Sequence, residues 1–307
     1  MSRAAITLFK NMRAIGYVPF YLAVQRGDWA REGVEGQIEN APYMTQTAAA
    51  PLDGRADVSW GGSMLVLMHH DRDRGCPLVC VAQVVARDPS ILVGRKPNCR
   101  FRFRDLGGKR IAVATEAPTP WMTFQDDLAR AGVDPAALNR VPDLAMAEYA
   151  ALLESCELDV VQLFEPYADD LVEKGAGHIW HRFAARSDIA YTSFYTTRSF
   201  ASDQRDACSA LVRGIASAQQ ALHRETPAAI AETITGFFPE RSTAQLSRII
   251  GAYRKSGFWA RTPALPAEAF ERLKAALLSG GLIGYDAPYD DLVDAELSAA
   301  PSKETGS

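Results

Sequence analysis

The sequence AREGVE at residues 30–35 returns as ARAGVD at residues 129–134, an offset of 99 positions. A second pair of segments follows in the same order, because LDGRADVSWGG, which contains Asp57, matches ESCELDVVQLFEP, which contains Asp159, at an offset of 102. Two matches at nearly the same offset indicate one α/β unit that occurs twice in the chain. We therefore predict two lobes with a ligand cleft between them.

Composition and charge bound the class of protein. At 307 residues the chain is long enough for two lobes of ordinary size, and its 48% apolar and 23% charged residues are typical of a globular protein. The net charge of −4 argues against a nucleic-acid-binding protein, which needs a basic face. The apolar run at residues 63–68 is far too short to span a bilayer. We expect a monomer with a small-molecule ligand and no nucleic-acid partner.

Apolar or β-branched runs alternate with segments of helical spacing, which predicts a parallel sheet covered by helices in each lobe. The predicted strands are residues 4–9, 34–39, 56–60, 78–85, 90–95, 110–114, 140–142, 159–164 and 189–197. The predicted helices are residues 21–33, 45–53, 63–69, 123–131, 145–153, 166–174, 205–224, 227–236, 241–255 and 267–278, with a turn at Gly61-Gly62. The fold class is therefore α/β.

The order of these elements divides the chain. We predict that residues 1–88 and 192–300 form lobe one with the C-terminal helices, that residues 89–191 form lobe two, and that the tail at 301–307 is disordered. The chain then crosses twice between two Rossmann-like lobes, which makes a two-strand hinge able to close on a ligand. A rigid two-domain α/β protein is the alternative.

The stretch IGYVPFYLAVQRGDWAREGVEGQIE (residues 15–39) resembles the opening of a family of periplasmic substrate-binding proteins. This family serves aliphatic sulfonates, nitrate and thiamin pyrimidine precursors. Its positions are matched here by Gly16, Pro19, Ala23, Gly27, Trp29, Gly33 and Val34. Its later segments are similar to LDGRAD (52–57), DLGGKRIAVA (105–114), GVDPAAL (132–138) and FEPYADDL (164–171). Cys156 departs from the pattern, because it stands where the second copy of the Leu-x-x-Gly-x-x-Asp signature would have glycine.

The resemblance covers about residues 6–285 and implies a type II periplasmic-binding-protein fold. It implies a solute-binding protein that delivers its ligand to an ABC permease, and we expect a binding protein in preference to an enzyme. The N-terminus carries no signal-peptide apolar region, so the chain is periplasmic if a leader has been removed and cytoplasmic otherwise. A cytoplasmic enzyme or ligand sensor on the same fold, desulfinase-like or related to pyrimidine-precursor synthesis, is the alternative.

Ligands of open parallel sheets bind where strands run into helices. That rule selects residues 10–21, 42–46, 60–63, 115–121 and 164–166. The aromatic residues of these loops suit a flat or apolar ligand body, while cations and helix N-termini favour an anionic group. Ser63 follows two glycines at a helix start, so its N–H and hydroxyl are candidates for an oxyanion. The predicted ligand-binding residues are Lys10, Asn11, Arg13, Tyr17, Tyr21, Tyr43, Thr45, Trp60, Gly61, Gly62, Ser63, Thr115, Glu116, Thr119, Trp121, Phe164 and Glu165.

No catalytic residue, metal site or cofactor is predicted. Residues 10–19 lack the cysteine nucleophile that aryl-sulfinate desulfinases carry in the first cleft loop, and the five cysteines show no zinc spacing. We expect these cysteines to be buried or half-buried thiols. His69-His70-Asp71 is the one triplet that looks catalytic, and we assign it to a solvated helix C-terminus.

Overall fold

The computed structural model describes residues 4–10, 12–41, 46–114, 117–141 and 143–299, and the chain divides into two compact units. Unit 1 comprises Met1–Ala86, Asp188–Lys274 and Ile283–Ser307, and unit 2 comprises Arg87–Ser187 and Ala275–Leu282. The chain therefore passes between the units four times, not twice as predicted. The second pair of passages begins within α12 (Ala267–Ser279), so residues 275–282 belong to unit 2 and not to the first lobe.

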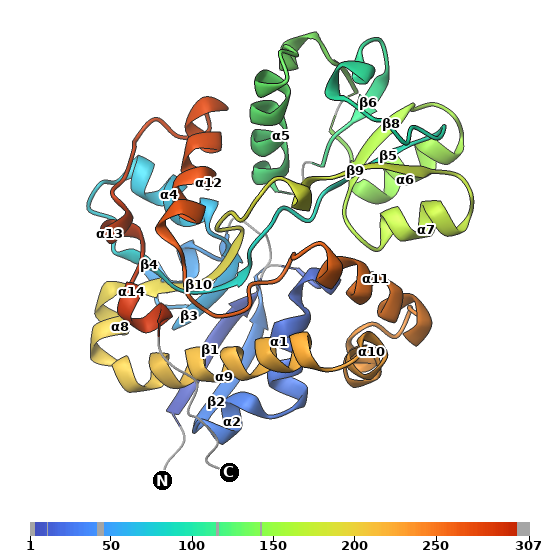
Figure 1. Ribbon diagram of the computed structural model, residues 1–307. Helices are drawn as coiled ribbons and strands as arrows, with labels where there is room; N and C mark the ends of the chain where they lie inside the picture. Colours follow the sequence, from blue (N-terminus) through green and yellow to red (C-terminus); the bar gives the residue numbers. More distant parts are fainter. Residues whose placement is uncertain (1–3, 11, 42–45, 115–116, 142, 300–307) are drawn as a thin grey trace. The chain divides into compact units, whose positions relative to one another are not determined.

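Unit 1 is built on a five-stranded sheet in the order β2-β1-β3-β10-β4 (Figure 1). β1 runs parallel to β2 and β3, and β10 runs antiparallel to β3 and β4. Asp57 precedes β3 and exchanges hydrogen bonds with Thr7 of β1, because its Oδ2 accepts from the Thr7 N–H at 2.7 Å while its own N–H donates to the Thr7 carbonyl at 3.0 Å. The strands are β1 (Ala4–Lys10), β2 (Val34–Asn40), β3 (Val58–Gly62), β4 (Leu78–Val85) and β10 (Thr192–Thr197).

The helices of unit 1 bury its large core against the sheet. Trp29 shows how they interlock, because its indole N–H donates to the Leu211 carbonyl at 3.1 Å and holds α2 against α9. The N-terminal helical elements are η1 (Ile15–Tyr17), α1 (Val18–Gln25), α2 (Asp28–Arg31), α3 (Ala49–Leu52) and α4 (Met64–Arg72). The C-terminal ones are α8 (Arg198–Asp203), α9 (Arg205–Arg224), α10 (Pro227–Ile234), η6 (Thr235–Phe237), α11 (Thr243–Lys255), α13 (Tyr289–Leu292) and α14 (Ala295–Ser298).

Unit 2 repeats this plan. Its sheet has the order β7-β6-β8-β5-β9, in which β6 is parallel to β7 and β8 while β5 is antiparallel to β8 and β9. Asp159 occupies the place of Asp57, because its Oδ2 accepts from the Arg110 N–H at 3.1 Å and its N–H donates to the Arg110 carbonyl at 3.0 Å. The strands are β5 (Ile91–Gly94), β6 (Arg110–Ala112), β7 (Asn139–Arg140), β8 (Val160–Leu163) and β9 (His178–Arg182).

Alternating side chains divide the core of unit 2 between the two faces of its sheet. Val161 and Leu163 pack with the helices α6 (Met146–Glu154) and α7 (Tyr167–Glu173), whereas Val160 packs with α5 (Pro118–Arg130). The remaining short helices are η3 (Phe103–Leu106), η4 (Pro135–Ala137) and η5 (Phe183–Ala185). No helix in the described part of the chain is both long and apolar enough to cross a membrane.

Two details of the first lobe differ from the prediction. The segment predicted as one helix at 21–33 is broken into α1 and α2 by Gly27, whose φ of 67° is left-handed. The Gly61-Gly62 pair is not a turn, because both glycines are the last residues of β3. The strand predicted at 78–85 coincides with β4, all of whose residues are buried.

Candidate functional site

The predicted ligand-binding residues follow the carboxyl ends of the parallel strands, where ligands of such sheets bind. Asn11, Tyr43, Thr45, Thr115 and Glu116 lie outside the described residues. The other twelve can be placed, eight in unit 1 and four in unit 2.

In unit 1, β3 reaches the carboxyl edge beneath a buried hydroxyl pair. The Tyr195 hydroxyl donates to Thr47 Oγ1 at 2.6 Å. A Cβ at Gly61 would lie 2.6 Å from that tyrosine oxygen and 3.1 Å from Thr47 Oγ1, so only glycine fits. Burial raises the pKa of Tyr195 above its usual range, so the phenol keeps its proton and remains a hydrogen-bond donor.

Ser63 does not present free groups to an oxyanion, which corrects the prediction. Its N–H donates to the Tyr191 carbonyl at 3.1 Å, and its hydroxyl lies 2.7 Å from the Ser193 hydroxyl. Ser63 is also completely buried. Both of its polar groups therefore tie the start of α4 (residues 64–72) to β10.

The predicted aromatic residues of unit 1 pack against other rings of the core. Trp60 is fully buried and stacks on Phe20, with ring centroids 4.0 Å apart and an angle of 7° between the planes. Phe194 meets the edge of this stack. Tyr17 packs edge-on against Phe20, and the ring of Tyr21 lies 4.7 Å from that of Phe237, a residue from a distant part of the sequence. Trp60 is thus a core residue and not a stacking platform for a ligand.

The two predicted cations of unit 1 differ in how far they are neutralised. Arg13 forms a two-pronged ion pair with Glu240 at 2.8 and 2.9 Å and also donates to the Phe237 carbonyl at 2.8 Å. Lys10 lies 5.5 Å from the centroid of the Tyr21 ring. Burial, and secondarily the charge of Arg13, lowers the pKa of Lys10. An anion near Lys10 would stabilise the charged ammonium group and oppose this lowering of its pKa, whereas Arg13 already has its counter-ion.

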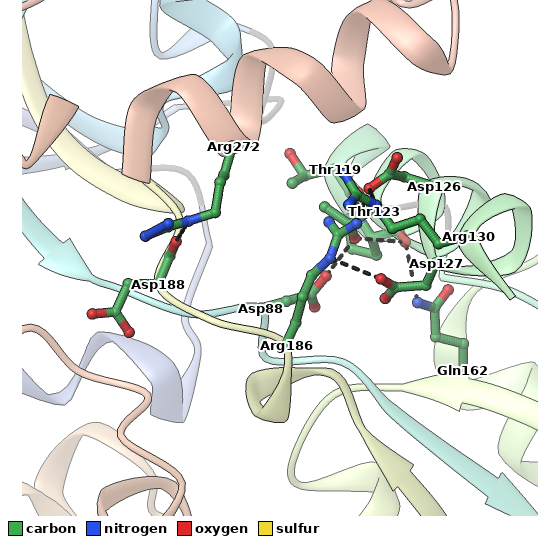
Figure 2. A network of polar contacts seen from close by, with 11 residues as sticks. Asp88, Thr119, Thr123, Asp126, Asp127, Arg130, Gln162, Arg186, Asp188 and Arg272 are labelled. Atoms are coloured by element: carbon green, nitrogen blue, oxygen red, sulfur yellow. Dashed lines mark hydrogen bonds and ion pairs between the residues drawn. The ribbon is translucent and has the colours of Figure 1, made fainter. Parts of the chain in front are cut away.

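In unit 2 the carboxyl edge holds a buried polar network that the sequence analysis missed (Figure 2). The Asp88 carboxylate accepts hydrogen bonds from the Ser90 N–H at 2.8 Å, the Ser90 hydroxyl at 2.5 Å and the Thr123 hydroxyl at 2.6 Å. Gln162 of β8 donates to the Ser90 hydroxyl at 3.1 Å and accepts from the Ala114 N–H at 3.3 Å. Burial raises the pKa of Asp88, and its hydrogen bonds oppose that shift.

The same network reaches α5 through Arg186, which forms ion pairs with Asp126 and, at 2.8 Å, with Asp127. Arg130 also contacts Asp126 at 2.8 Å. Burial raises the pKa of Asp127 to about 6, with the Arg186 charge opposing the shift and the Asp88 and Asp126 charges adding to it. The segments at residues 88–90 and 186, which lie at the first pair of passages into and out of unit 2, are therefore fastened to one helix.

The four predicted residues of unit 2 are mostly engaged. Glu165 is only 5% exposed, forms an ion pair with Arg182 at 3.3 Å and accepts from the Asp169 N–H at 2.9 Å. Burial raises its pKa. The Arg140 guanidinium covers the Trp121 ring at 4.1 Å, and Phe164 packs against the core cluster of α6 and α7. The Thr119 carbonyl accepts from the Thr123 hydroxyl at 3.0 Å, so Thr119 adjoins the Asp88 network.

The histidine triplet is not solvated as predicted, because His70 is 2% exposed and its Nε2 lies 2.9 Å from the Leu78 carbonyl. The Asp71 carboxylate accepts from the N–H groups of Gly284 and Tyr285, so the triplet is structural. Among the described residues no group of three His, Cys, Asp or Glu side chains could hold a metal ion.

The five cysteines are all free, and the prediction of buried or half-buried thiols holds for three of them. Cys76, Cys80 and Cys208 are buried, whereas Cys99 and Cys156 are exposed. Burial raises the pKa of Cys80 and that of Cys208 to about 12. These two thiols stay protonated at neutral pH and are poor nucleophiles.

Sequence analysis missed Thr47, Tyr195, Asp88, Gln162 and Arg186 because no short motif joins them. Tyr195 lies 148 residues from Thr47, and Asp88 lies 35 residues from Thr123. The sequence carries only an indirect sign of the Thr47–Tyr195 pair, which is the glycine pair Gly61-Gly62. A glycine pair that ends a buried strand indicates that another group approaches the backbone closely.

Known proteins resemble this chain in sequence. The family described as NMT1/THI5 like matches residues 15–229. The Bacillus subtilis protein YtlA is 25% identical over 293 residues, which cover 95% of this chain and 88% of that protein.

Solved structures match along the whole chain. The periplasmic aliphatic sulphonate binding protein SsuA from Escherichia coli superposes with a TM-score of 0.76 at 15% identity, covering 97% of this chain and 99% of that one. The periplasmic nitrate-binding protein NrtA from Synechocystis gives 0.70 at 14% identity, covering 96% and 87%. The desulfurization enzyme DSZB gives 0.68 at 15% identity, covering 96% and 98%. The fold is thus the two-unit α/β fold of periplasmic binding proteins, which at least one enzyme shares.

Proposed function

The chain belongs to the NMT1/THI5-like family, and from this membership we propose that it is a solute-binding protein that captures a small molecule and delivers it to an ABC importer. We place it outside the cytoplasm, as a monomer, with a permease as its protein partner and without a cofactor. The likeness to the sulphonate- and nitrate-binding proteins supports this proposal.

The observation that carries the proposal is the buried hydroxyl pair above Gly61. Tyr195 and Thr47 are both completely buried, yet they hold two hydroxyl groups over a strand end that has no side chain. Polar groups buried at the carboxyl edge of a sheet orient ligands, whereas core packing alone would favour apolar side chains there. The Tyr195 hydroxyl is already bonded to Thr47, so the proposed role of this pair is to position the Gly61 backbone at the ligand edge of unit 1.

The proposed ligand has a flat or apolar body and one anionic or polar group. Lys10 supplies the positive charge, because the charge of Arg13 is matched by Glu240. Asn11, Tyr43 and Thr45 remain proposed contacts. Trp60 and Ser63 are withdrawn from the set, because the ring of Trp60 stacks on Phe20 in the core and the hydroxyl of Ser63 is bonded to Ser193. In unit 2 the proposed contacts are Thr115, Glu116 and Thr119.

A desulfinase-like reaction on this chain would need an accessible thiolate. Cys80 contacts Ser63 and Ser193 near the carboxyl edge of unit 1, but it is completely buried and burial raises its pKa to about 12. Of the two exposed thiols, Cys156 lies in the turn that leads into the amino end of β8, and Cys99 lies between β5 and η3, ahead of the amino end of β6. Both are therefore away from the carboxyl edge. These placements favour binding over cysteine-based catalysis.

Isothermal titration against aromatic sulfonates, aromatic carboxylates, aminopyrimidines and nitrate tests the proposal. We expect one organic class to bind, with the compound recovered unchanged by mass spectrometry. Thr47→Val should weaken that binding roughly fivefold, since a hydrogen bond contributes about 1 kcal/mol. The control is Thr233→Val, whose hydroxyl donates to the Ala229 carbonyl within α10. Binding of inorganic anions alone, or turnover of the ligand, would contradict the proposal.

A further inference from the structure

The positive charge of this acidic chain is concentrated in one segment of unit 2. Residues 95–110, RKPNCRFRFRDLGGKR, carry seven Lys or Arg and one Asp, although the whole chain has a net charge of −4. A segment of this kind attracts anions over distances of about a Debye length, roughly 8–10 Å.

This segment borders a hollow at the amino ends of β6 and β8, opposite in strand direction to the edge proposed for the transported ligand. The hollow has a volume of about 430 Å³, which is the size of a small-ligand pocket. Its charged and polar lining consists of Arg95, Lys96, Asn98, Asp105, Lys109 and Asp159.

Trp180 forms an aromatic wall of the same hollow. Its indole lies directly on the backbone of Gly94, where a Cβ would come within 2.1 Å of the ring, and its N–H donates to the Lys96 carbonyl at 2.7 Å. The ring is therefore fixed in place without a ligand, and β5 leaves room for it by ending in glycine.

The two carboxylates of the hollow both accept hydrogen bonds within the protein, but only Asp159 is also neutralised by an ion pair. Asp159 binds Arg95 at 2.9 Å and the Arg110 N–H, and Asp105 accepts from the Asn98 amide at 3.0 Å and from the Arg102 N–H at 2.9 Å.

The lysines of the hollow are left to attract other anions. Lys96 has no ion-pair partner among the described residues, and Lys109 acts on the Asp159 carboxylate only through its charge. Two lysine ammonium groups therefore remain for an external anion.

The duplicated fold provides an internal comparison. Unit 1 has a hollow at the corresponding place, which contains Asp57, the counterpart of Asp159, and has a volume of about 510 Å³. Its described lining includes the carboxylates of Asp57 and Asp203 and no Lys or Arg. The fold thus accounts for a hollow at this place, but it does not account for the cations and the indole that only unit 2 has.

We propose that the hollow of unit 2 is a second binding site, which takes a small multivalent oxyanion of the phosphate-ester or polycarboxylate class. Lys96 and Lys109 bind the charged groups, and the Trp180 ring bounds the body of the anion. This site is independent of the proposed transport ligand, because it lies at the other end of the strands.

The test is calorimetric titration of the full chain with pyrophosphate and with citrate, accompanied by NMR of the Trp180 indole N–H. We expect saturable one-site binding of at least one of the two anions and a shift of the indole signal, which Trp180→Phe identifies. Lys96→Gln with Lys109→Gln should weaken binding at least tenfold. Arg100→Gln with Arg104→Gln removes the same charge from the same segment outside the hollow, and it should change the affinity less than threefold.

Three outcomes would overturn the proposal. The first is the absence of saturable binding of either anion at millimolar concentration. The second is an equal loss in both double variants, which would indicate only the general field of the basic segment. The third is binding that leaves the Trp180 indole signal unmoved, because the anion would then lie elsewhere.

Discussion

Replacing Cys156 by glycine should stabilise unit 2. Cys156 is the one non-glycine residue of the described chain with a positive φ, 65°, and its counterpart in the first copy is Gly54, with φ of 74°. The left-handed conformation costs an L-residue about 1–2 kcal/mol. Glycine also lowers the free energy of unfolding by about 0.4–1 kcal/mol, because it gives the unfolded chain more conformational entropy. The net gain is about 0.5–1 kcal/mol, which for a unit of this size raises Tm by about 2–6 °C.

Backbone hydrogen bonds show that the two turns are otherwise alike. In each turn, two successive N–H groups donate hydrogen bonds to one carbonyl of the preceding helix. In unit 1 the donors are Arg55 and Ala56, which bond the Ala50 carbonyl at 3.0 and 3.3 Å. In unit 2 they are Glu157 and Leu158, which bond the Leu152 carbonyl at 2.9 and 3.1 Å. Scanning calorimetry and urea titration of each variant give the change in stability. Cys156→Ala removes the thiol but keeps the strained backbone, so it should leave Tm nearly unchanged, and Gly54→Ala should lower the stability of unit 1. An equal rise in Cys156→Ala and Cys156→Gly would refute the reasoning, because the thiol and not φ would then be the cause.

Two further predictions concern packing and pH. Gly214→Ala in α9 should destabilise unit 1 by about 1–3 kcal/mol in urea titration, because the new Cβ would lie 2.2 Å from the Trp29 ring. Gly251→Ala in α11 should instead stabilise unit 1 by about 0.5–1 kcal/mol, because the nearest atom to its new Cβ is 3.7 Å away and alanine favours a helix. If both helical glycines respond alike, the close contact is not the cause. The raised pKa of Asp127, about 6, means that the native state holds this proton more tightly than the unfolded state. Its contribution to stability is therefore full below pH about 4 and is lost by pH about 6, a change of up to about 3 kcal/mol. Asp127→Asn should lack this loss in urea titrations between pH 4 and 6.5, and a parallel decline of the wild type and the variant would contradict the assignment.

The sequence predicted the fold well because the fold depends on local patterns. The sequence match that aligns Asp57 with Asp159 corresponds to identical structural roles. Each aspartate exchanges two hydrogen bonds with the first parallel strand of its own unit. The strand at 78–85 was found because an unbroken apolar run is typical of a strand buried on both faces. The passage through α12 was missed because nothing in a helical pattern marks a change of unit within one helix.

The candidate site was predicted less well, and the reason is physical. Position along the chain shows that Trp60 and Ser63 follow a strand end, but it does not show that Phe20 covers the indole or that Ser193 binds the hydroxyl. Arg13 likewise appears free until Glu240, 227 residues away, is placed against it. Some side chains at a sheet edge pack into the core and others stay available to a ligand. Tertiary contacts alone determine which side chain does which.

The two units share a framework and differ at their edges. Asp57 and Asp159 act alike, because each accepts from a backbone N–H of the neighbouring parallel strand in its own unit. At the carboxyl edge, unit 1 has a neutral Tyr195–Thr47 pair where unit 2 has an ionisable carboxyl, Asp88, that donors surround. The buried polar groups at this edge therefore differ in charge between the units, because the Tyr195–Thr47 pair of unit 1 is neutral whereas unit 2 keeps a carboxyl group whose acceptors are filled by Ser90 and Thr123.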